Sequence, residues 1–244
     1  MKGACFPPIR DPNELPRNVL VLGAHPDDEV IGIGGLLAFH AERGDAVRVV
    51  HATDGAAGDP EGRHENVVGI RRAEAAAAAA ALGLGVPESL GFPDGGLRDR
   101  FAELVTAVRA LFRESRPALL YTFHGGEFHP DHRAVAEAAC ACREELEPGA
   151  RILCFGVNQV PPFAALFEYG ARLGKKEAAL ACFRSQLAYL DFATKVMQRD
   201  RAATVNVEIP EITHAECLLE LAPGNWPAHI VHMEALRRDS EGEA

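Results

Sequence analysis

The sequence lacks an excess of positive charge. Lys and Arg number 25 against 35 Asp and Glu, which gives a formal net charge of −10 at pH 7 over 244 residues. Nucleic-acid phosphates and anionic lipid surfaces are bound through clustered Lys and Arg, so this composition argues against both kinds of partner. The charge balance instead favours a small-molecule partner.

Long hydrophobic runs are also absent. No apolar stretch is long enough to span a bilayer, and the alanine run over residues 75–81 is too short and too weakly apolar to do so. The N-terminus has no charged segment followed by an apolar core of the kind that marks a secretory signal. These absences predict a soluble cytoplasmic protein without a membrane partner.

Cysteine is present, but not in the patterns that carry chemistry. The six cysteines form no CxxC pair, and several lie inside apolar helix or strand patterns, so we expect no disulfide framework. Cys140 and Cys142 could suggest a soft metal site, but thiols two residues apart on a helix point to different faces. We therefore predict reduced, packed cysteines.

What the sequence does contain is a regular alternation of strand-length apolar runs with helical patterns. Continuous apolar runs are typical of strands buried on both faces of a parallel sheet. The alternation predicts an α/β fold with a doubly wound, mostly parallel sheet of strand order 3-2-1-4-5 and right-handed crossovers. The expected strands are 18–24, 46–52, 88–92, 118–123 and 151–157, and the expected helices are 29–43, 63–82, 99–115 and 130–147.

The length suits one large domain. Residues 1–17 are rich in proline and predict an extended lead-in. Residues 18–236 then form a single α/β domain, made of a core (18–157) and a helical and strand C-terminal extension (158–236) that includes a long helix over 174–199. Residues 237–244 are expected to be a solvated charged tail.

Two similar polar clusters follow two of the predicted strands. The segment Ala24-His25-Pro-Asp27-Asp28-Glu29 comes after the first strand, and His129-Pro-Asp131-His132 comes after the fourth. In a sheet of order 3-2-1-4-5 these two strands are neighbours, and ligands bind at their C-terminal ends, where the winding reverses. The clusters are therefore expected to form one site.

Two imidazoles and a carboxylate are the ligand set of an open catalytic zinc site. We predict that His25, Asp28 and His132 hold the metal. Asp27, next to a ligand but pointing differently, is predicted to act as the general base. His129 is the candidate electrophile or acid, with Asp131 as the carboxylate that orients it.

Further motifs occur in a characteristic order. They are Thr53-Asp-Gly55, Arg71-x-x-Glu74, Gly91-Phe-Pro-Asp94, Ser185-Gln-Leu187 and His214-Ala-Glu216. Together with the two clusters they resemble the LmbE-like, or PIG-L, family of zinc-dependent N-deacetylases. The resemblance extends over residues 18 to about 220.

The resemblance implies a Rossmann-like fold and removal of an acetyl or other acyl group from an amide nitrogen on an amino sugar, such as N-acetylglucosamine, or its conjugate. It implies Zn²⁺ on His25, Asp28 and His132, with Fe²⁺ as a substitute metal. Arg71 and Asp94 match positions that line the substrate pocket. Members of the family often assemble, so a homo-oligomer is an open expectation.

Other readings compete with these. Two histidines and a carboxylate also suit a non-haem Fe(II) oxygenase, and the sheet crevice could serve a non-catalytic sugar- or nucleotide-binding module. Arg71 could instead be a surface helix residue paired with Glu74 or Glu65, and Asp94 only a turn residue.

Overall fold

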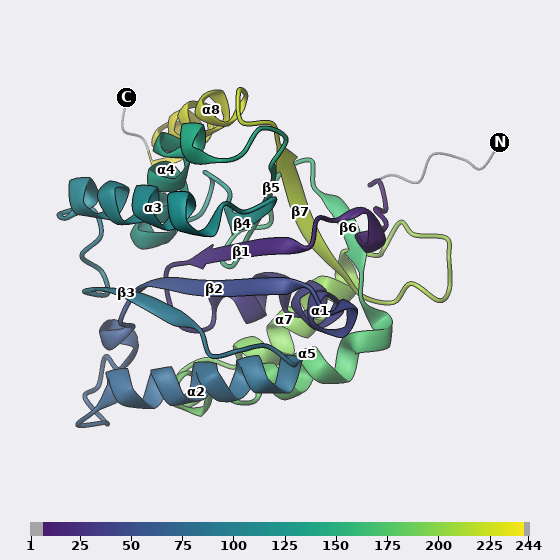
Figure 1. The fold of residues 1–244 in the computed structure, drawn as a ribbon. Helices are drawn as coiled ribbons and strands as arrows, with labels where there is room; N and C mark the ends of the chain where they lie inside the picture. Colours follow the sequence, from purple (N-terminus) through teal and green to yellow (C-terminus); the bar gives the residue numbers. More distant parts are fainter. Residues whose placement is uncertain (1–6, 242–244) are drawn as a thin grey trace.

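The computed structural model describes residues 7–241, in which a seven-stranded sheet lies between two layers of helices (Figure 1). The remaining parts of the predicted lead-in (1–6, with Cys5) and tail (242–244) lie outside the described residues. The strand order is β3-β2-β1-β4-β5-β7-β6. The strands are β1 (Asn18–Gly23), β2 (Ala46–Thr53), β3 (Glu88–Phe92), β4 (Leu119–Phe123), β5 (Arg151–Phe155), β6 (Ala165–Glu168) and β7 (Ala215–Leu221).

The helices divide between the two faces of the sheet. Helices α3, α4 and α8 cover one face, and α1, α2, α5 and α7 cover the other (Figure 1). Among the described helices, none combines the length and the apolar character needed to cross a bilayer. The helices are α1 (Asp28–Arg43), α2 (Val67–Leu82), α3 (Phe101–Ser115), α4 (Pro130–Ala141), α5 (Leu173–Leu180), α6 (Arg184–Leu187), α7 (Phe192–Ala202) and α8 (Trp226–Glu241).

The predicted doubly wound sheet is confirmed. Strands β3, β2, β1, β4 and β5 pair in parallel, in the predicted order 3-2-1-4-5. Strands β1 and β4 are neighbours, with Val19 opposite Leu119 and Leu20 opposite Leu120. All four of these side chains are buried, as expected for strands covered by helices on both faces. The C-terminal part adds β7 antiparallel to β5 and β6 antiparallel to β7.

The single long helix predicted over 174–199 is wrong. The chain there forms α5, α6 and α7 in succession. Glu74 of α2 accepts hydrogen bonds from the backbone N and the Oγ of Ser185 at the start of α6 (2.8 and 2.6 Å). Asp191 caps α7 by accepting from the Thr194 amide at 3.2 Å. These polar contacts interrupt an apolar stripe that, taken alone, reads as one helix.

Two other predicted boundaries also differ. The helix expected to run from Pro130 to residue 147 ends at Ala141 and is followed by a single 3-10 turn, Arg143–Glu145. Helix α8 runs through to Glu241, so the predicted start of a solvated tail at residue 237 falls inside a helix.

Helix α1 is kinked at Ile33, whose φ of −142° and ψ of 24° are not helical. The kink frees backbone groups on both sides of it, and side chains from the C-terminal extension bind them. The carboxylate of Glu216 on β7 accepts from the amides of Gly35 (2.7 Å) and Leu36 (2.9 Å), and Arg199 on α7 donates to the Ile31 carbonyl at 2.8 Å. The extension therefore holds both halves of the broken helix.

A buried lysine supports this arrangement. Lys176 is fully buried, and its Nζ lies 2.7 Å from both Glu216 and Asp200. The side chains around the kink pack closely: a Cβ on Gly35 would lie 2.2 Å from Cγ of Tyr169. Gly35 therefore lets helix α1 approach the Tyr169 ring closely.

Candidate functional site

The two polar clusters lie together at the C-terminal ends of β1 and β4. His25 stands between β1 and α1, and His129 is the N-cap of α4, followed by Pro130 in the first turn. Proline fits this position because its missing N–H would have no helical partner there. The predicted meeting of the clusters is confirmed, since His25 Nδ1 lies 3.2 Å from His132 Nε2.

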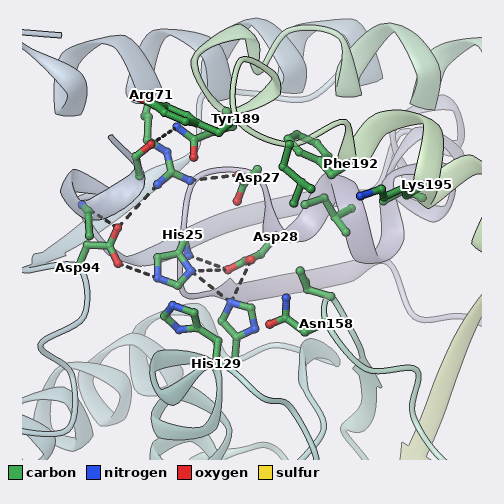
Figure 2. A pocket seen from close by; sticks show the side chains of 18 of the residues that line it. His25, Asp27, Asp28, Arg71, Asp94, His129, Asn158, Tyr189, Phe192 and Lys195 are labelled. Atoms are coloured by element: carbon green, nitrogen blue, oxygen red, sulfur yellow. Dashed lines mark hydrogen bonds and ion pairs between the residues drawn. The ribbon is translucent and has the colours of Figure 1, made fainter. Parts of the chain in front are cut away.

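The three predicted metal ligands lie close together, and Figure 2 labels two of them, His25 and Asp28. His132 Nε2 lies 3.2 Å from Asp28 Oδ1, and His25 Nδ1 lies 3.5 Å from Asp28 Oδ2. All three residues are buried. Asp28 is fixed by its own turn, because its Oδ2 accepts from the amides of Ala24 (3.0 Å) and His25 (2.7 Å).

These separations fit a zinc ion. Two nitrogen or oxygen ligands at about 2.0–2.1 Å from Zn²⁺ in tetrahedral geometry lie roughly 3.3 Å from each other. His132 Nε2 lies 3.2 Å from both His25 Nδ1 and Asp28 Oδ1, which is close to that value, and His25 Nδ1 lies 3.5 Å from the other Asp28 oxygen. The electrostatics also suit a cation: burial lowers the pKa of His132, but the charge and hydrogen bond of Asp28 and the hydrogen bond of Glu127 raise it to about 9.

Two other groupings bring ligand atoms within 4.8 Å of one another, and both share His25. One consists of His25, His129 and His132, and the other of His25, Asp94 and Asp131. In the second grouping the carboxylates already accept backbone hydrogen bonds: Asp131 from Gly95 N and Leu97 N, and Asp94 from Ala57 N. The set His25, Asp28 and His132 is favoured because it combines two imidazole nitrogens 3.2 Å apart with a carboxylate oxygen, Asp28 Oδ1, 3.2 Å from one of them, which is the donor set of an open zinc site.

The second ring nitrogen of His25 faces carboxylates. Its Nε2 lies 3.0 Å from Asp94 Oδ1 and 3.4 Å from Asp131 Oδ2, although neither contact has good hydrogen-bond geometry and Nε2 has no other partner within the described chain. A metal-binding imidazole commonly directs its other nitrogen at a carboxylate. Asp94 therefore lies beside the candidate metal site and is more than a turn residue.

Asp27 lies at the wall of the same site, held by a cation. Its Oδ2 accepts from Arg71 Nη2 at 3.1 Å, and both side chains are almost fully buried. Burial raises the pKa of Asp27 from 3.8 to about 6, even though the Arg71 charge opposes this shift. The raised pKa places this carboxyl in the range that suits a general base near neutral pH.

Arg71 projects from α2 into the site rather than to solvent. Its Nη1 donates to the Gly55 carbonyl at 2.9 Å and lies 3.7 Å from Asp94 Oδ2. The alternative of a surface helix residue is wrong, since Arg71 is buried, and Glu74 binds Ser185 instead.

The predicted contact between His129 and the Asp131 carboxylate is absent from the described structure. The Asp131 carboxylate accepts from Gly95 N at 2.7 Å and Leu97 N at 3.2 Å, while its backbone N–H donates to His129 Nδ1 at 3.2 Å. An N-cap side chain points at the amides of its own helix, so His129 meets the Asp131 amide rather than the Asp131 carboxylate. His129 is thus oriented by the backbone of Asp131.

Burial and the neighbouring His25 and His132 imidazoles lower the pKa of His129. Because Nδ1 accepts a hydrogen bond, the ring hydrogen of neutral His129 resides on Nε2. A neutral His129 can therefore still donate from Nε2.

Sequence reasoning missed Glu127. Its buried carboxylate lies 2.8 Å from His132 Nδ1 and accepts from the amides of residues 157–159. Burial opposes ionisation, but the bonds to His132 and Val157 outweigh it and lower the pKa of Glu127. The only signal was an acidic residue in the glycine-containing loop two positions before His129, and many loops contain one.

The site forms the floor of a cavity of about 600 Å³. Arg71 and Asp94 lie on one side, and Phe192 and Lys195 of α7 lie on the opposite side (Figure 2). Apolar side chains from elements far apart in sequence also line the cavity: Ile31, Val157, Leu190 and Val196. A space of this size and lining accommodates a small organic ligand.

Comparison with known proteins places the chain in a family. Residues 20–142 match the model of the PIG-L family, described as GlcNAc-PI de-N-acetylase. A 1D-myo-inositol 2-acetamido-2-deoxy-alpha-D-glucopyranoside deacetylase of Mycobacterium sp. (strain KMS) is 36% identical over 162 residues, which are 55% of this chain and 53% of that protein. The chain spans about half the length of the curated relatives it matches.

Solved structures share the fold over most of the chain. The N,N'-diacetylchitobiose deacetylase of Pyrococcus horikoshii superposes with a TM-score of 0.72 at 21% identity, covering 89% of this chain and 88% of that one. GalB, the 4-carboxy-2-hydroxymuconate hydratase of Pseudomonas putida KT2440, superposes with a TM-score of 0.69 at 26% identity, covering 84% and 96%. The predicted fold class is thus confirmed independently of the site.

Proposed function

This chain belongs to the PIG-L family, and from that premise we propose that it is a metal-dependent amide hydrolase. It removes an acetyl, or another acyl, group from an N-acylated amino sugar or sugar conjugate. One observation carries the proposal: on the floor of the cavity His25 Nδ1 and His132 Nε2 lie 3.2 Å apart, and each lies 3.2–3.5 Å from a carboxylate oxygen of Asp28, with Asp27 beside them.

The donor set of two imidazole nitrogens and one carboxylate oxygen fits zinc, and Fe²⁺ can substitute on the same ligands. When bound, the metal supplies a Lewis acid for the amide carbonyl and lowers the pKa of water. His25, Asp28 and His132 would hold it, and their burial keeps competing water away from the ligand atoms.

Asp27 takes the proton from the attacking water and returns it to the departing amine. The Arg71 guanidinium holds its Oδ2, which fixes the carboxylate in place against the cavity. A base that is already oriented saves the cost of ordering it during the reaction.

His129 stabilises the negative charge that develops on the carbonyl oxygen. With Nδ1 occupied by the Asp131 amide, its Nε2–H is the donor available to the cavity. Asp131 enters this proposal as a positioning residue: its amide orients His129, and its carboxylate binds the turn that carries Asp94.

The sugar occupies the polar side of the cavity, where Arg71 and Asp94 lie, and the group attached to the sugar faces the apolar side formed by Phe192 and its neighbours. We further propose a cytoplasmic setting, which is supported by the five free cysteines of the described chain. The net charge of −10 supports a small-molecule substrate without a nucleic-acid or membrane partner. A homo-oligomer stays an open expectation.

A second candidate is hydration of a carbon–carbon double bond. The hydratase of Pseudomonas putida is 26% identical and is covered over 96% of its length, and a metal with an adjacent base can also direct water to an unsaturated acid. This rival needs no amide in its substrate, which separates it from the first candidate. A non-haem Fe(II) oxygenase would consume dioxygen during turnover. A non-catalytic sugar- or nucleotide-binding module would bind its ligand without converting it.

The deciding experiment uses the zinc-loaded full chain with metal analysis in parallel. Free amine and acetate are measured for N-acetylglucosaminides that carry neutral, carboxylated, phosphorylated and sugar aglycones, and loss of ultraviolet absorbance is measured for unsaturated dicarboxylates. We expect equal amounts of amine and acetate from at least one glucosaminide, dependent on His132. Turnover of an unsaturated acid with no amine release would replace hydrolysis by hydration.

A further inference from the structure

Glu127 lies in the loop between β4 and α4 and is only 1% exposed. Its carboxylate meets two parts of the site at once. Oε2 lies 2.8 Å from Nδ1 of His132, and Oε1 accepts from the amide of Val157 at 2.7 Å. The amides of Asn158 (3.2 Å to each oxygen) and Gln159 (3.3 Å to Oε1) complete the set.

We infer that Glu127 is a positioning residue that makes His132 a metal ligand and, through the same carboxylate, anchors the cavity wall formed by residues 157–159. The inference rests on the proposed function only in taking His132 as a ligand. It assigns to one buried side chain both the affinity for the metal and the shape of the wall that the substrate contacts.

The first half of the inference concerns the tautomer of His132. An ionised carboxylate only accepts hydrogen bonds, so Nδ1 of His132 carries the hydrogen. Nε2 then keeps its lone pair, and Nε2 is the atom 3.2 Å from both His25 Nδ1 and Asp28 Oδ1. Without Glu127 the neutral ring could place its hydrogen on either nitrogen, and only one of the two forms can bind the metal.

The second half concerns the wall. Val157 and Asn158 line the cavity, and Asn158 lies beside the histidine cluster in Figure 2. Their amides point at the carboxylate rather than at another strand. The preceding turn is tight, since a Cβ on Gly156 would lie 1.8 Å from the Gln159 carbonyl oxygen. The carboxylate therefore binds a segment whose glycine lets it fold back toward Glu127.

This geometry makes the isosteric Glu127→Gln variant informative. If the amide oxygen faces residues 157–159, the NH₂ group faces His132 and forces Nδ1 to accept, which moves the ring hydrogen onto Nε2. The flipped side chain would place its NH₂ group against the three backbone N–H donors of residues 157–159, so the first orientation is favoured. Glutamine can satisfy one side only, whereas removal of the side chain in Glu127→Ala leaves Nδ1 free to donate to water.

The test compares Glu127→Gln, Glu127→Ala and the wild type, with Glu137→Gln as a matched control. Glu137 is on α4 and pairs with Arg98 outside the site. The zinc dissociation constant is measured by competition with a chromogenic chelator. The His132 tautomer of the metal-free chain is measured by side-chain ¹⁵N NMR at a pH above about 9, where the ring is neutral. We expect a roughly 10- to 100-fold weaker affinity for zinc in Glu127→Gln, a smaller loss that still exceeds twofold in Glu127→Ala, and an unchanged affinity in the control.

We also expect the wild-type His132 ring to carry its hydrogen on Nδ1, and the Glu127→Gln ring on Nε2. An affinity for zinc within twofold of wild type in Glu127→Gln, or an Nε2–H tautomer in the wild type, would overturn the inference. If Glu127→Gln does not fold, as judged by circular dichroism, wild-type affinity in Glu127→Ala overturns it equally.

Substrate kinetics keep this result separate from the proposed function. A wild type that hydrolyses no amide while Glu127→Gln loses zinc contradicts the proposed function and leaves the inference intact. A wild type that hydrolyses amides while Glu127→Gln keeps its zinc affinity supports the proposed function and contradicts the inference. Loss of the wall anchor should additionally raise KM in metal-saturated Glu127→Ala by more than it lowers kcat.

Discussion

Replacing Asp27 by asparagine should lower the catalytic activity and raise the free energy of unfolding at neutral pH. Asparagine keeps an oxygen for the Arg71 guanidinium, 3.1 Å from the present carboxylate, but it cannot take a proton. General-base catalysis contributes about 10²–10⁴-fold, so kcat/KM should fall by that factor, equivalent to about 3–5 kcal/mol of transition-state stabilisation. Zinc content should not change, because Asp27 is not among the predicted ligands.

The gain in stability follows from the pKa of the same group. Burial, which is only partly offset by Arg71, raises the pKa of Asp27 from 3.8 to about 6, and ionising the buried carboxyl therefore costs up to about 3 kcal/mol at neutral pH. A folded-state pKa above the unfolded value means that the folded chain binds more protons. Stability is then fully present below about pH 4 and is lost as the pH rises through about 6.

The assay is urea unfolding of the metal-free wild type and Asp27→Asn at pH 4 and pH 7. The two unfolding free energies should be similar at pH 4, and at pH 7 the variant should be more stable by about 1–3 kcal/mol. Metal-loaded activity is measured on the same preparations. A difference that is the same at both pH values would refute the electrostatic reasoning, and full activity in Asp27→Asn would refute the proposed base.

Three further changes test other parts of the molecule. His132→Ala should lower bound zinc from about one per chain to a trace, and retention of the ion after gel filtration would exclude His132 as a ligand. Lys176→Met leaves the buried Glu216 carboxylate without its cation, while Asp200 keeps Arg199, and should destabilise the chain by about 3–5 kcal/mol in urea; unaltered stability would contradict the ion cluster. Gly35→Ala should cost about 1–3 kcal/mol or more because its Cβ meets the Tyr169 ring, whereas Gly174→Ala, where a Cβ meets nothing within 4 Å, serves as the tolerant control.

The centre of the sheet and the meeting of the clusters could be predicted because both depend on short-range patterns. Continuous apolar runs identify β1 and β4 as buried parallel strands, and right-handed winding makes them neighbours. Once they are adjacent, His25 and His132 must approach each other, whatever the details of the loops. The prediction therefore required topology but no side-chain geometry.

The rest depends on contacts between distant segments, which leave little trace in a local pattern. The breaks between α5, α6 and α7 come in part from Glu74, a residue more than a hundred positions away from Ser185. Glu127 acquires its role only when residues 157–159 fold back onto it. The carboxylate of Asp131 turned to the Gly95 loop because those amides lay within reach, and neighbouring sequence could not reveal this.

The kink in α1 limits how the chain can be divided. Every proposed metal ligand and catalytic residue lies between His25 and His132, so a fragment ending near Val157 would contain all of them. Yet the backbone groups that the kink in α1 leaves without helical partners are bound by Arg199 and Glu216, and such a fragment lacks both residues. Transplanting the site into another parallel sheet would therefore require the last third of the chain as well, and natural recombination that exchanged this last third would have to preserve both side chains.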